Sequence, residues 1–208
     1  MKLLVVDDHA IVREGLRRLI NDLMGSAVSI HDAEDGRQAL ELFRRLKPDI
    51  VLLDLNIPAI GGLELLRRLM IEQPTARIII FSMRSEPIYA ARALRLGAKG
   101  YLSKGAGSAD LIEAIKRVRD GSFYIEQEIA TQLAVGNFSG NEDPLQLLST
   151  RELEILRLLG EGKSLMQIAE ACGVSYKTVA NTCALIKGKL GLQTTAELIR
   201  LSIERLMR

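Results

Sequence analysis

Short apolar runs alternate with longer amphipathic stretches over the first 120 residues of the chain. Five runs have the length of a strand and little polar alternation, at residues 3–6, 28–30, 50–53, 78–81 and 100–102. Apolar residues recur at helical spacing after each run, which predicts five helices. Because strands without polar alternation are buried on both faces, the pattern predicts an α/β domain with a doubly wound, five-stranded parallel sheet.

The pattern changes after residue 120. Glycine, asparagine and proline are frequent between residues 121 and 144, and we expect a linker there that contains a helix at about 125–135. From residue 145 to 208 every segment is helical by pattern, with helices expected at 150–159, 165–171, 176–190 and 195–206. Ser149 followed by Glu152 is a capping-box signature, and glycines separate the helices. The chain is therefore expected to hold an α/β domain at 1–120 and an all-helical domain at 145–208.

Composition narrows the protein class. No apolar run approaches the ~20 residues that a membrane-spanning helix needs, so we expect no membrane association. Acids at positions 7 and 8 interrupt the first apolar run too early for a signal peptide. With only Cys172 and Cys183 a disulfide framework is not indicated, and the expected location is the reducing cytoplasm. Both cysteines are interpreted as core residues rather than redox sensors.

Charge is less informative. The net charge of the chain is +2, which by itself does not indicate a nucleic-acid partner. Residues 145–208 carry nine Lys or Arg against six Asp or Glu, whereas residues 1–144 carry 19 against 20. The mild excess of positive charge in the second domain only suggests such a partner.

Polar side chains follow the predicted strands. Asp7 and Asp8 follow the first strand and Asp54 follows the third, and the carboxyl ends of parallel strands meet at one edge of a sheet. Carboxylates gathered in one place repel each other, and their oxygens suit a hard cation such as Mg²⁺. Ser82 and Lys104 follow the fourth and fifth strands with groups suited to phosphate. Each residue alone has an ordinary reading as a cap or a solvated charge, but together they predict a phosphate-handling pocket.

Residues 1–119 resemble the receiver domain of two-component response regulators, which has a flavodoxin-like fold. The matching segments are Val5-Val6-Asp7-Asp8-His9, Leu53-Asp54-Leu55-Asn56-Ile57-Pro58, Phe81-Ser82-Met83 and Gly97-Ala98-Lys99-Gly100-Tyr101-Leu102-Ser103-Lys104. The resemblance implies that Asp54 accepts a phosphoryl group from a sensor histidine kinase. It also implies that Mg²⁺ is bound by Asp7, Asp8, Asp54 and the backbone carbonyl of Asn56, and that Ser82 and Lys104 hold the phosphoryl group.

The resemblance also implies a switch. Ser82 would shift toward the phosphoryl group and leave space that Tyr101 fills by rotating inward, which is a shift between two packings. The alternative for Tyr101 is an ordinary half-buried aromatic of a strand. His9 is expected to border the pocket without a catalytic role. Gly105 follows Lys104 where many receivers have proline, which leaves the local backbone geometry open.

Residues 148–208 resemble the LuxR-type helix-turn-helix domain of the NarL/FixJ family. The match rests on Leu148-Ser149-Thr150-Arg151-Glu152, Gln167-Ile168-Ala169, Val174-Ser175-Tyr176-Lys177-Thr178-Val179 and Lys189-Leu190-Gly191-Leu192, among other segments. It implies that the helix at 176–190 enters the major groove of double-stranded DNA. The residues expected at DNA are Lys177, Thr178, Ala180, Asn181, Ala184, Lys187 and Lys189. It further implies a homodimer after phosphorylation, through Leu198, Leu201 and Ile203.

The expected reading helix is poor in cations. Ala180, Cys183, Ala184 and Leu185 stand where relatives usually have more polar or basic side chains. Since contacts with phosphates supply most non-specific affinity, we expect weaker DNA binding with a shallower salt dependence. The main hypothesis is a transcription regulator gated by phosphorylation. The alternative is a signalling adaptor whose second domain binds protein, and an enzyme acting on an external substrate is not expected.

Overall fold

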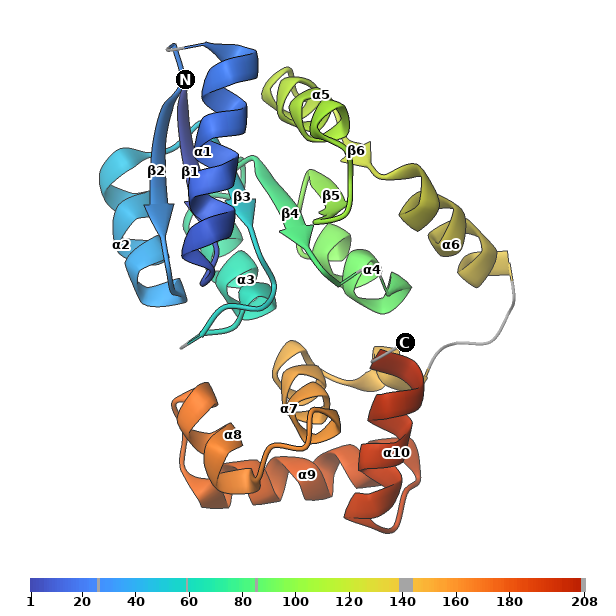
Figure 1. Cartoon of the computed structure of the whole chain (residues 1–208). Helices are drawn as coiled ribbons and strands as arrows, with labels where there is room; N and C mark the ends of the chain where they lie inside the picture. The colour runs from blue at the N-terminus through green and yellow to red at the C-terminus, as the bar shows by residue number, and fades with distance from the viewer. Residues whose placement is uncertain (26, 59, 85, 139–143, 207–208) are drawn as a thin grey trace. The chain divides into compact units, whose positions relative to one another are not determined.

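The computed structural model describes residues 1–25, 27–58, 60–84, 86–138 and 144–206. The chain divides into two compact units, Met1–Ser139 and Gly140–Arg208. The first unit is built on a parallel sheet with the strand order β2-β1-β3-β4-β5-β6 (Figure 1). Its strands are β1 Lys2–Val6, β2 Ser29–Ala33, β3 Ile50–Leu53, β4 Ile78–Ser82, β5 Gly100–Ser103 and β6 Tyr124–Ile125.

The sixth strand corrects the expected number of five. β6 pairs with the outer edge of β5, with Tyr124 opposite Gly100 and Ile125 opposite Tyr101. A strand of two residues is too short to produce a periodic pattern, and β6 lies in the segment that its glycines mark as a linker. The linker expected at 121–144 therefore contributes to the sheet of the first unit, and its residues 139–143 lie outside the described residues.

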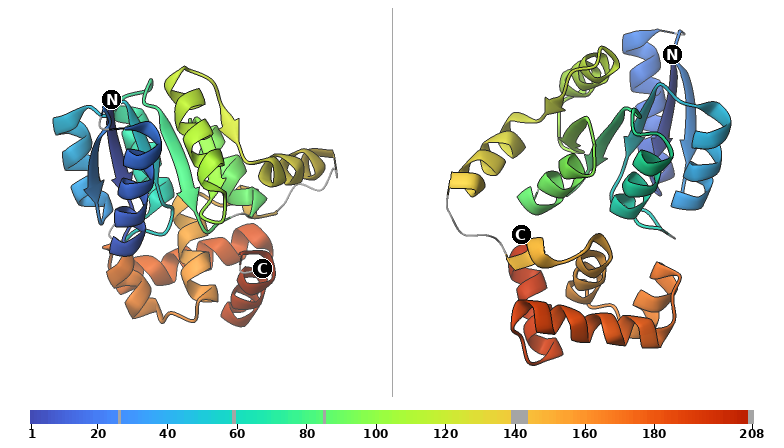
Figure 2. Two further views of the ribbon diagram at one scale, coloured as in Figure 1. Left: turned by 45° about the horizontal axis from the view of Figure 1, so that its top comes forward. Right: turned by 180° about the vertical axis from the view of Figure 1, so that it is seen from behind.

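Six helices belong to the first unit: α1 Ala10–Met24, α2 Gly36–Leu46, α3 Gly62–Glu72, α4 Pro87–Arg95, α5 Ser108–Arg119 and α6 Gln127–Phe138. Helices α1 and α5 cover one face of the sheet, and α2, α3 and α4 cover the other (Figures 1 and 2). Helix α6, expected within the linker, packs against α4. Both faces of the sheet are thus covered, as the apolar strands predict.

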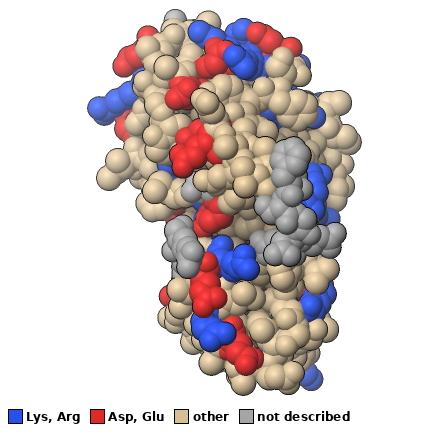
Figure 3. Space-filling view, turned by 90° about the vertical axis from the view of Figure 1, so that its right-hand side faces the viewer, with Lys and Arg blue, Asp and Glu red and all other residues tan. Residues whose placement is uncertain are grey.

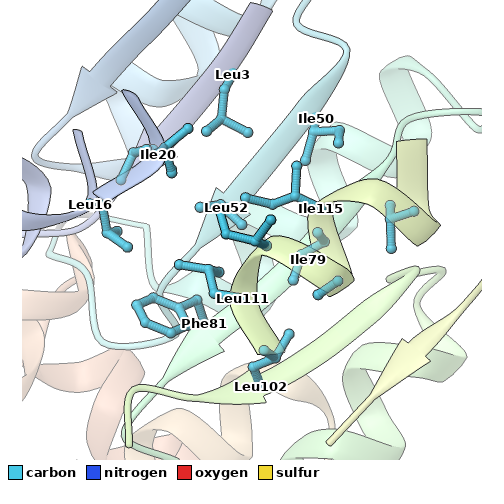
Figure 4. Close-up of a cluster of buried hydrophobic side chains, with 14 of the residues drawn as sticks. Leu3, Leu16, Ile20, Ile50, Leu52, Ile79, Phe81, Leu102, Leu111 and Ile115 are labelled. Atoms are coloured by element: carbon cyan, nitrogen blue, oxygen red, sulfur yellow. The ribbon is translucent and has the colours of Figure 1, made fainter. Parts of the chain in front are cut away.

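The core between the sheet and helices α1 and α5 is aliphatic apart from Phe81 (Figure 4). Alternate residues of the strands point into it, and Leu16 and Ile20 of α1 meet Leu111 and Ile115 of α5 there. Each such side chain stabilises the fold by about 1.5–3 kcal/mol when it is removed from water. This packing holds the strands in register and so fixes where their ends lie.

The parallel register brings the strand ends to one edge. Val6 pairs with Leu53, and Ser82 pairs with Ser103. The amide of Asp54 donates to the carbonyl of Val6 at 2.9 Å, and the amide of Lys104 donates to the carbonyl of Ser82 at 2.9 Å. Backbone hydrogen bonds therefore hold the residue that follows β3 to the end of β1, and the residue that follows β5 to the end of β4.

The second unit is helical: α7 Thr150–Gly160, α8 Leu165–Cys172, α9 Tyr176–Leu190 and α10 Thr195–Leu206, preceded by a 3₁₀ turn at Pro144–Leu147. The expected capping box of Ser149 and Glu152 begins α7. Gly173 ends α8 in the left-handed conformation at φ 64°, and Ser175 caps α9. Helices α8 and α9 form a helix-turn-helix, which α7 supports and α10 completes by packing along α7.

Gly62, at the start of α3, is predicted to be essential for the backbone that carries Asp54. A Cβ there would lie 2.3 Å from the Cα of Leu55 and 2.5 Å from the carbonyl oxygen of Asp54. Gly62→Ala should lower the free energy of unfolding by about 1–3 kcal/mol, because the backbone must move. Gly15→Ala is the matched control, since nothing lies within 4 Å of that Cβ, and it should stabilise α1 by up to about 1 kcal/mol. Urea unfolding measures the free energy of unfolding of both variants, and equal changes would contradict the requirement for glycine at position 62.

Candidate functional site

The buried carboxylates Asp7 and Asp54 share one cation. Asp7 is 1% exposed and Asp54 is 3% exposed. The ammonium of Lys104 lies 2.6 Å from Oδ2 of Asp7 and 2.6 Å from Oδ2 of Asp54. Two negatively charged carboxylates that both contact one ammonium lie close enough to repel each other, and the positive charge between them offsets that repulsion.

The same contacts keep Lys104 charged. Burial by itself lowers the pKa of Lys104, but hydrogen bonds and attraction to Asp54 and Asp7 outweigh it and raise the pKa above the ordinary value. An ammonium fixed beside Asp54 at neutral pH can neutralise negative charge on any group that is attached there.

The second oxygen of Asp54 is also held. Its Oδ1 accepts a hydrogen bond from the hydroxyl of Ser82 at 2.5 Å and from the amide of Asn56 at 3.1 Å. Ser82 is fully buried at the end of β4. The structure thus brings together Asp54, Ser82, Lys104 and Asn56, and both oxygens of the central carboxylate have defined partners.

Asp8 and His9 border this pocket. Nδ1 of His9 lies 2.7 Å from Oδ1 of Asp8 and 3.3 Å from Oδ1 of Asp7. One possible ligand atom from each of Asp7, Asp8, His9 and Asp54 lies within 4.8 Å of the others. Three carboxylates in this arrangement are a donor set that suits a hard divalent cation. His9 lies at the rim, as expected.

Tyr101 is completely buried, so the alternative of a half-buried strand aromatic is wrong. Its hydroxyl donates to the carbonyl of Arg84 at 2.5 Å. Burial, followed by the negative charge of Glu86, holds the pKa of this hydroxyl well above its ordinary value, so that it stays a donor. The ring has the inward position that was expected to accompany phosphorylation.

Arg84 is a site residue that sequence reasoning missed. Its side chain is mostly buried, and its guanidinium makes long contacts of 3.4 Å with the side-chain oxygen of Asn56. Its amide lies 3.4 Å from the hydroxyl of Ser82. An arginine two residues past a strand is normally solvated, so the sequence carries no signal for this role.

In the second unit, helix α9 presents the expected face. Val179, Cys183 and Ile186 are buried against the other helices. Lys177, Thr178, Asn181 and Ala184 are exposed, whereas Ala180, Lys187 and Leu190 are partly exposed. The burial of this stripe therefore leaves the predicted DNA-facing residues of α9 exposed or partly exposed, Lys189 included.

Lys189 also makes contacts within its own unit. Its ammonium lies 2.7 Å from Oε2 of Glu152 and 3.3 Å from the carbonyl of Leu147. Glu152 is buried and completes the capping box of α7. This ion pair holds α9 to the start of α7, while the side chain of Lys189 stays 41% exposed, so its contact with DNA phosphates remains a prediction.

Helices α8 and α9 of the second unit carry exposed apolar side chains. Met166 of α8 is 66% exposed, Leu185 of α9 is 61% exposed, and Tyr176 is also exposed. On the face of the molecule in Figure 3, acidic and basic side chains are interspersed and neither sign dominates. Part of the apolar character of α8 and α9 is therefore located at the surface.

Two family models match the chain: "Response regulator receiver domain" at residues 3–116 and "Bacterial regulatory proteins, luxR family" at residues 146–202. The response regulator GacA of Pseudomonas aeruginosa is 37% identical over 205 residues, which are 98% of this chain and 95% of that protein. This chain belongs to the two-component response regulators. Its receiver is joined to a LuxR-type domain, as in the NarL/FixJ family.

Other relatives span the whole response regulator as well. The transcriptional activator protein ExaE of Pseudomonas putida is 39% identical over 208 residues, which are 98% of this chain and 96% of that protein. The response regulator UvrY of Escherichia coli K12 is 35% identical, with shares of 98% and 94%.

Solved structures agree with the fold. A LuxR-family two-component response regulator from Aurantimonas sp. SI85-9A1 has a TM-score of 0.62 at 37% identity, covering 66% of this chain and 97% of that chain. RcsB of Salmonella typhimurium has a TM-score of 0.76 at 23% identity, with shares of 99% and 98%. Among the described residues of this response regulator, no helix has the length and apolar character needed to cross a membrane.

The last helix corrects one expectation about dimerisation. Leu198 is fully buried in its own unit, together with Ser202 and Leu206 on the same stripe of α10. Leu201 is partly exposed and Ile203 is 49% exposed. The apolar stripe of α10 mostly serves packing along α7, so only Leu201 and Ile203 of the three expected residues are accessible.

Both cysteines of this response regulator are buried, as the core interpretation requires. Burial raises the pKa of the Cys172 thiol and of the Cys183 thiol. A raised pKa lowers the fraction of reactive thiolate at neutral pH, which supports packing over redox sensing.

The contact between Lys189 and Glu152 is predicted to stabilise the second unit. Burial raises the pKa of Glu152, but its bonds to Lys189 and Ser149 outweigh this and lower it, so the stabilisation is present above the ordinary glutamate pKa and is lost as the pH falls through the lowered value. Lys189→Met should cost about 0.5–1.5 kcal/mol at neutral pH and less near pH ~3. Urea unfolding of the full chain at both pH values tests this. Lys187→Met is the control, and an equal loss there would contradict it.

Proposed function

We propose that this response regulator accepts a phosphoryl group on Asp54 from a sensor histidine kinase and then controls transcription through sequence-specific DNA binding. The observation that carries the proposal is the environment of Asp54. Lys104 binds one carboxylate oxygen, and Ser82 and the amide of Asn56 bind the other. These are a cation and two donors that could bind a phosphoryl group attached to this carboxylate.

A divalent cation fits the proposal. Asp7, Asp8, Asp54 and the backbone carbonyl of Asn56 would hold Mg²⁺, because their oxygens form the donor set that this ion prefers. When bound, Mg²⁺ supplies charge neutralisation at the oxygens of the phosphoryl group. Lys104 carries one positive charge and already faces two carboxylates. A phosphoryl group on Asp54 would add negative charge, which a second cation would neutralise.

The transfer itself needs little from the protein beyond positioning. An oxygen of the Asp54 carboxylate attacks phosphorus, and the bond from phosphorus to the histidine nitrogen of the kinase breaks. The leaving imidazole keeps the bonding electron pair and takes up a proton. Lys104 and Ser82 stabilise the phosphoryl oxygens, and water later releases phosphate and restores Asp54. The receiver thus modifies only its own side chain, and we do not assign it an external substrate.

The output is assigned to helix α9. Lys177 would contact phosphates, Asn181 would pair with an adenine edge, and Ala180 and Ala184 would meet thymine methyl groups. A homodimer formed after phosphorylation would bring two such helices to paired half-sites. RcsB, which shares this fold, has been solved bound to promoter rprA and as two dimers bound to two parallel DNAs, and this likeness of fold supports the output. Such a regulator works in the cytoplasm.

A second candidate function is a phosphorylation-dependent adaptor whose second unit binds protein. It is favoured by the exposed side chains of Met166, Leu185 and Tyr176 and by the ion pair that Lys189 forms with Glu152. Selection of random duplex DNA with and without beryllium fluoride and Mg²⁺ separates the two. Enrichment of a paired motif mainly with beryllium fluoride supports the transcription regulator. Dimerisation without any enrichment supports the adaptor.

Asp54→Asn should abolish labelling by radioactive acetyl phosphate in the presence of Mg²⁺, because the amide is not nucleophilic. Asp22→Asn is the matched control, since Asp22 is exposed on α1, and it should be labelled like the parent protein. Acid-quenched filter binding measures the label. Full labelling of Asp54→Asn would overturn the site assignment.

Lys177→Ala and Asn181→Ala should each weaken binding to the selected DNA. Losing a base contact costs about 1–3 kcal/mol, and losing a phosphate contact reduces the salt dependence by about one unit of slope. Fluorescence anisotropy at several salt concentrations distinguishes the two effects. Lys116→Ala removes the same charge from α5 and should change neither. Unchanged affinity in both α9 variants would show that another face binds DNA.

A further inference from the structure

We propose that Glu126 is a positioning residue that holds the end of β5, and with it Lys104, in place beside Asp54. The inference rests on the proposed phosphorylation of Asp54 and adds a residue from the segment between β6 and α6. Nothing in the sequence pattern marks this position, because Glu126 lies in the segment that is expected to be a linker.

Glu126 binds β5 three times. The amide of Ser103 donates to Oε2 of Glu126 at 2.6 Å, and the hydroxyl of Ser103 donates to Oε1 at 3.2 Å. The amide of Glu126 in turn donates to the carbonyl of Tyr101 at 3.0 Å. Tyr101 and Ser103 are the residues of β5 on either side of Leu102, so one residue fixes the half of the strand that leads into the pocket.

The position of Lys104 depends on this segment. Ser103 directly precedes Lys104, and Gly105 directly follows it. After Lys104, the amide of Ala106 donates to the carbonyl of Ser103 at 3.1 Å, which closes the turn and restrains Lys104 from the Gly105 side. The two hydrogen bonds from Ser103 to Glu126 restrain it from the other side. An ammonium that must meet two carboxylates and a phosphoryl group needs a fixed backbone, because small displacements weaken such contacts steeply.

A simple helix cap does not account for these contacts. An N-cap carboxylate accepts from the second or third amide of its helix. In the hydrogen bonds of the described residues, both carboxylate oxygens of Glu126 accept from Ser103 instead. The backbone carbonyl of Glu126 begins α6 by accepting from Ala130 at 2.9 Å. The carbonyl of Glu126 thus begins α6, whereas its side chain and its amide bind β5.

The arrangement connects the pocket with α6. Helix α6 packs against α4 and is the last described element of the first unit. A displacement of α6 would move Glu126 and, through the hydrogen bonds of Glu126, would also move Ser103, which directly precedes Lys104. Because coupling free energies are reciprocal, a phosphoryl group held by Lys104 would stabilise the attachment of α6 to the same extent.

The test compares three variants of the full chain: Glu126→Ala, Glu126→Gln and, as the control, Glu128→Ala. Glu128 is exposed in the first turn of α6, so its loss removes the same charge without a bond to β5. The measurements are the beryllium fluoride concentration for half-saturation in Mg²⁺, the extent of labelling by acetyl phosphate and the midpoint of thermal unfolding without beryllium fluoride.

We expect Glu126→Ala to raise the half-saturating concentration about three- to tenfold. Glu126→Gln should recover most of the affinity, because its amide oxygen can still accept from the Ser103 amide. Glu128→Ala should match the parent. Recovery by glutamine at an unchanged unfolding midpoint separates positioning from general stability.

If all variants have the same half-saturating concentration while the parent protein is still labelled, the proposed role of Glu126 is overturned. Absence of labelling in the parent would instead overturn the proposed phosphorylation.

If Glu126→Ala does not fold, Glu126→Gln and Ser103→Ala decide. Ser103→Ala removes only the hydroxyl contact and should raise the half-saturating concentration less than twofold. A larger loss in Glu126→Gln than in Ser103→Ala would contradict the argument, because glutamine keeps the amide contact.

Discussion

The structure of the receiver depends on one ammonium between two buried carboxylates. Asp7 and Asp54 are brought together by the register of β1 and β3, and their repulsion is balanced by Lys104 from the end of β5. Chemistry at Asp54 changes this balance of charge directly. A pocket whose charges are nearly balanced responds strongly to one added anion, and the neighbouring Ser82 and Tyr101 lie where such a response can be transmitted.

Much of this pocket could be predicted from the sequence, for a physical reason. Asp7, Asp54 and Lys104 directly follow apolar strands, Ser82 ends one, and parallel strands end at one edge. Arg84 and Glu126 could not be found in this way. A charged residue just past a strand or in a glycine-rich segment is usually solvated, and only the tertiary structure places these two against Asn56 and Ser103.

In the second unit, the sequence predicts the helices well but not the contacts of individual side chains. The four helices and the caps Ser149 and Ser175 follow from local signals, which the structure reproduces. The use of individual side chains does not follow. Lys189 and Leu198 have the residue types expected at DNA and at a dimer interface, yet Lys189 also forms an ion pair with Glu152, and Leu198 is fully buried in its own unit. Helical periodicity assigns a face, but it does not show which neighbour covers that face.

The short strand β6 has a consequence for the behaviour of the protein at high concentration. An open edge of a sheet is a template on which a strand of another molecule can add. In the receiver, β6 covers part of the edge of β5 and itself offers only two residues, after which the chain turns into α6. The edge beyond β5 is thus too short to seed the stacking of strands from many molecules. On this side of the sheet, a strand from a second receiver would therefore find no long edge with which to pair.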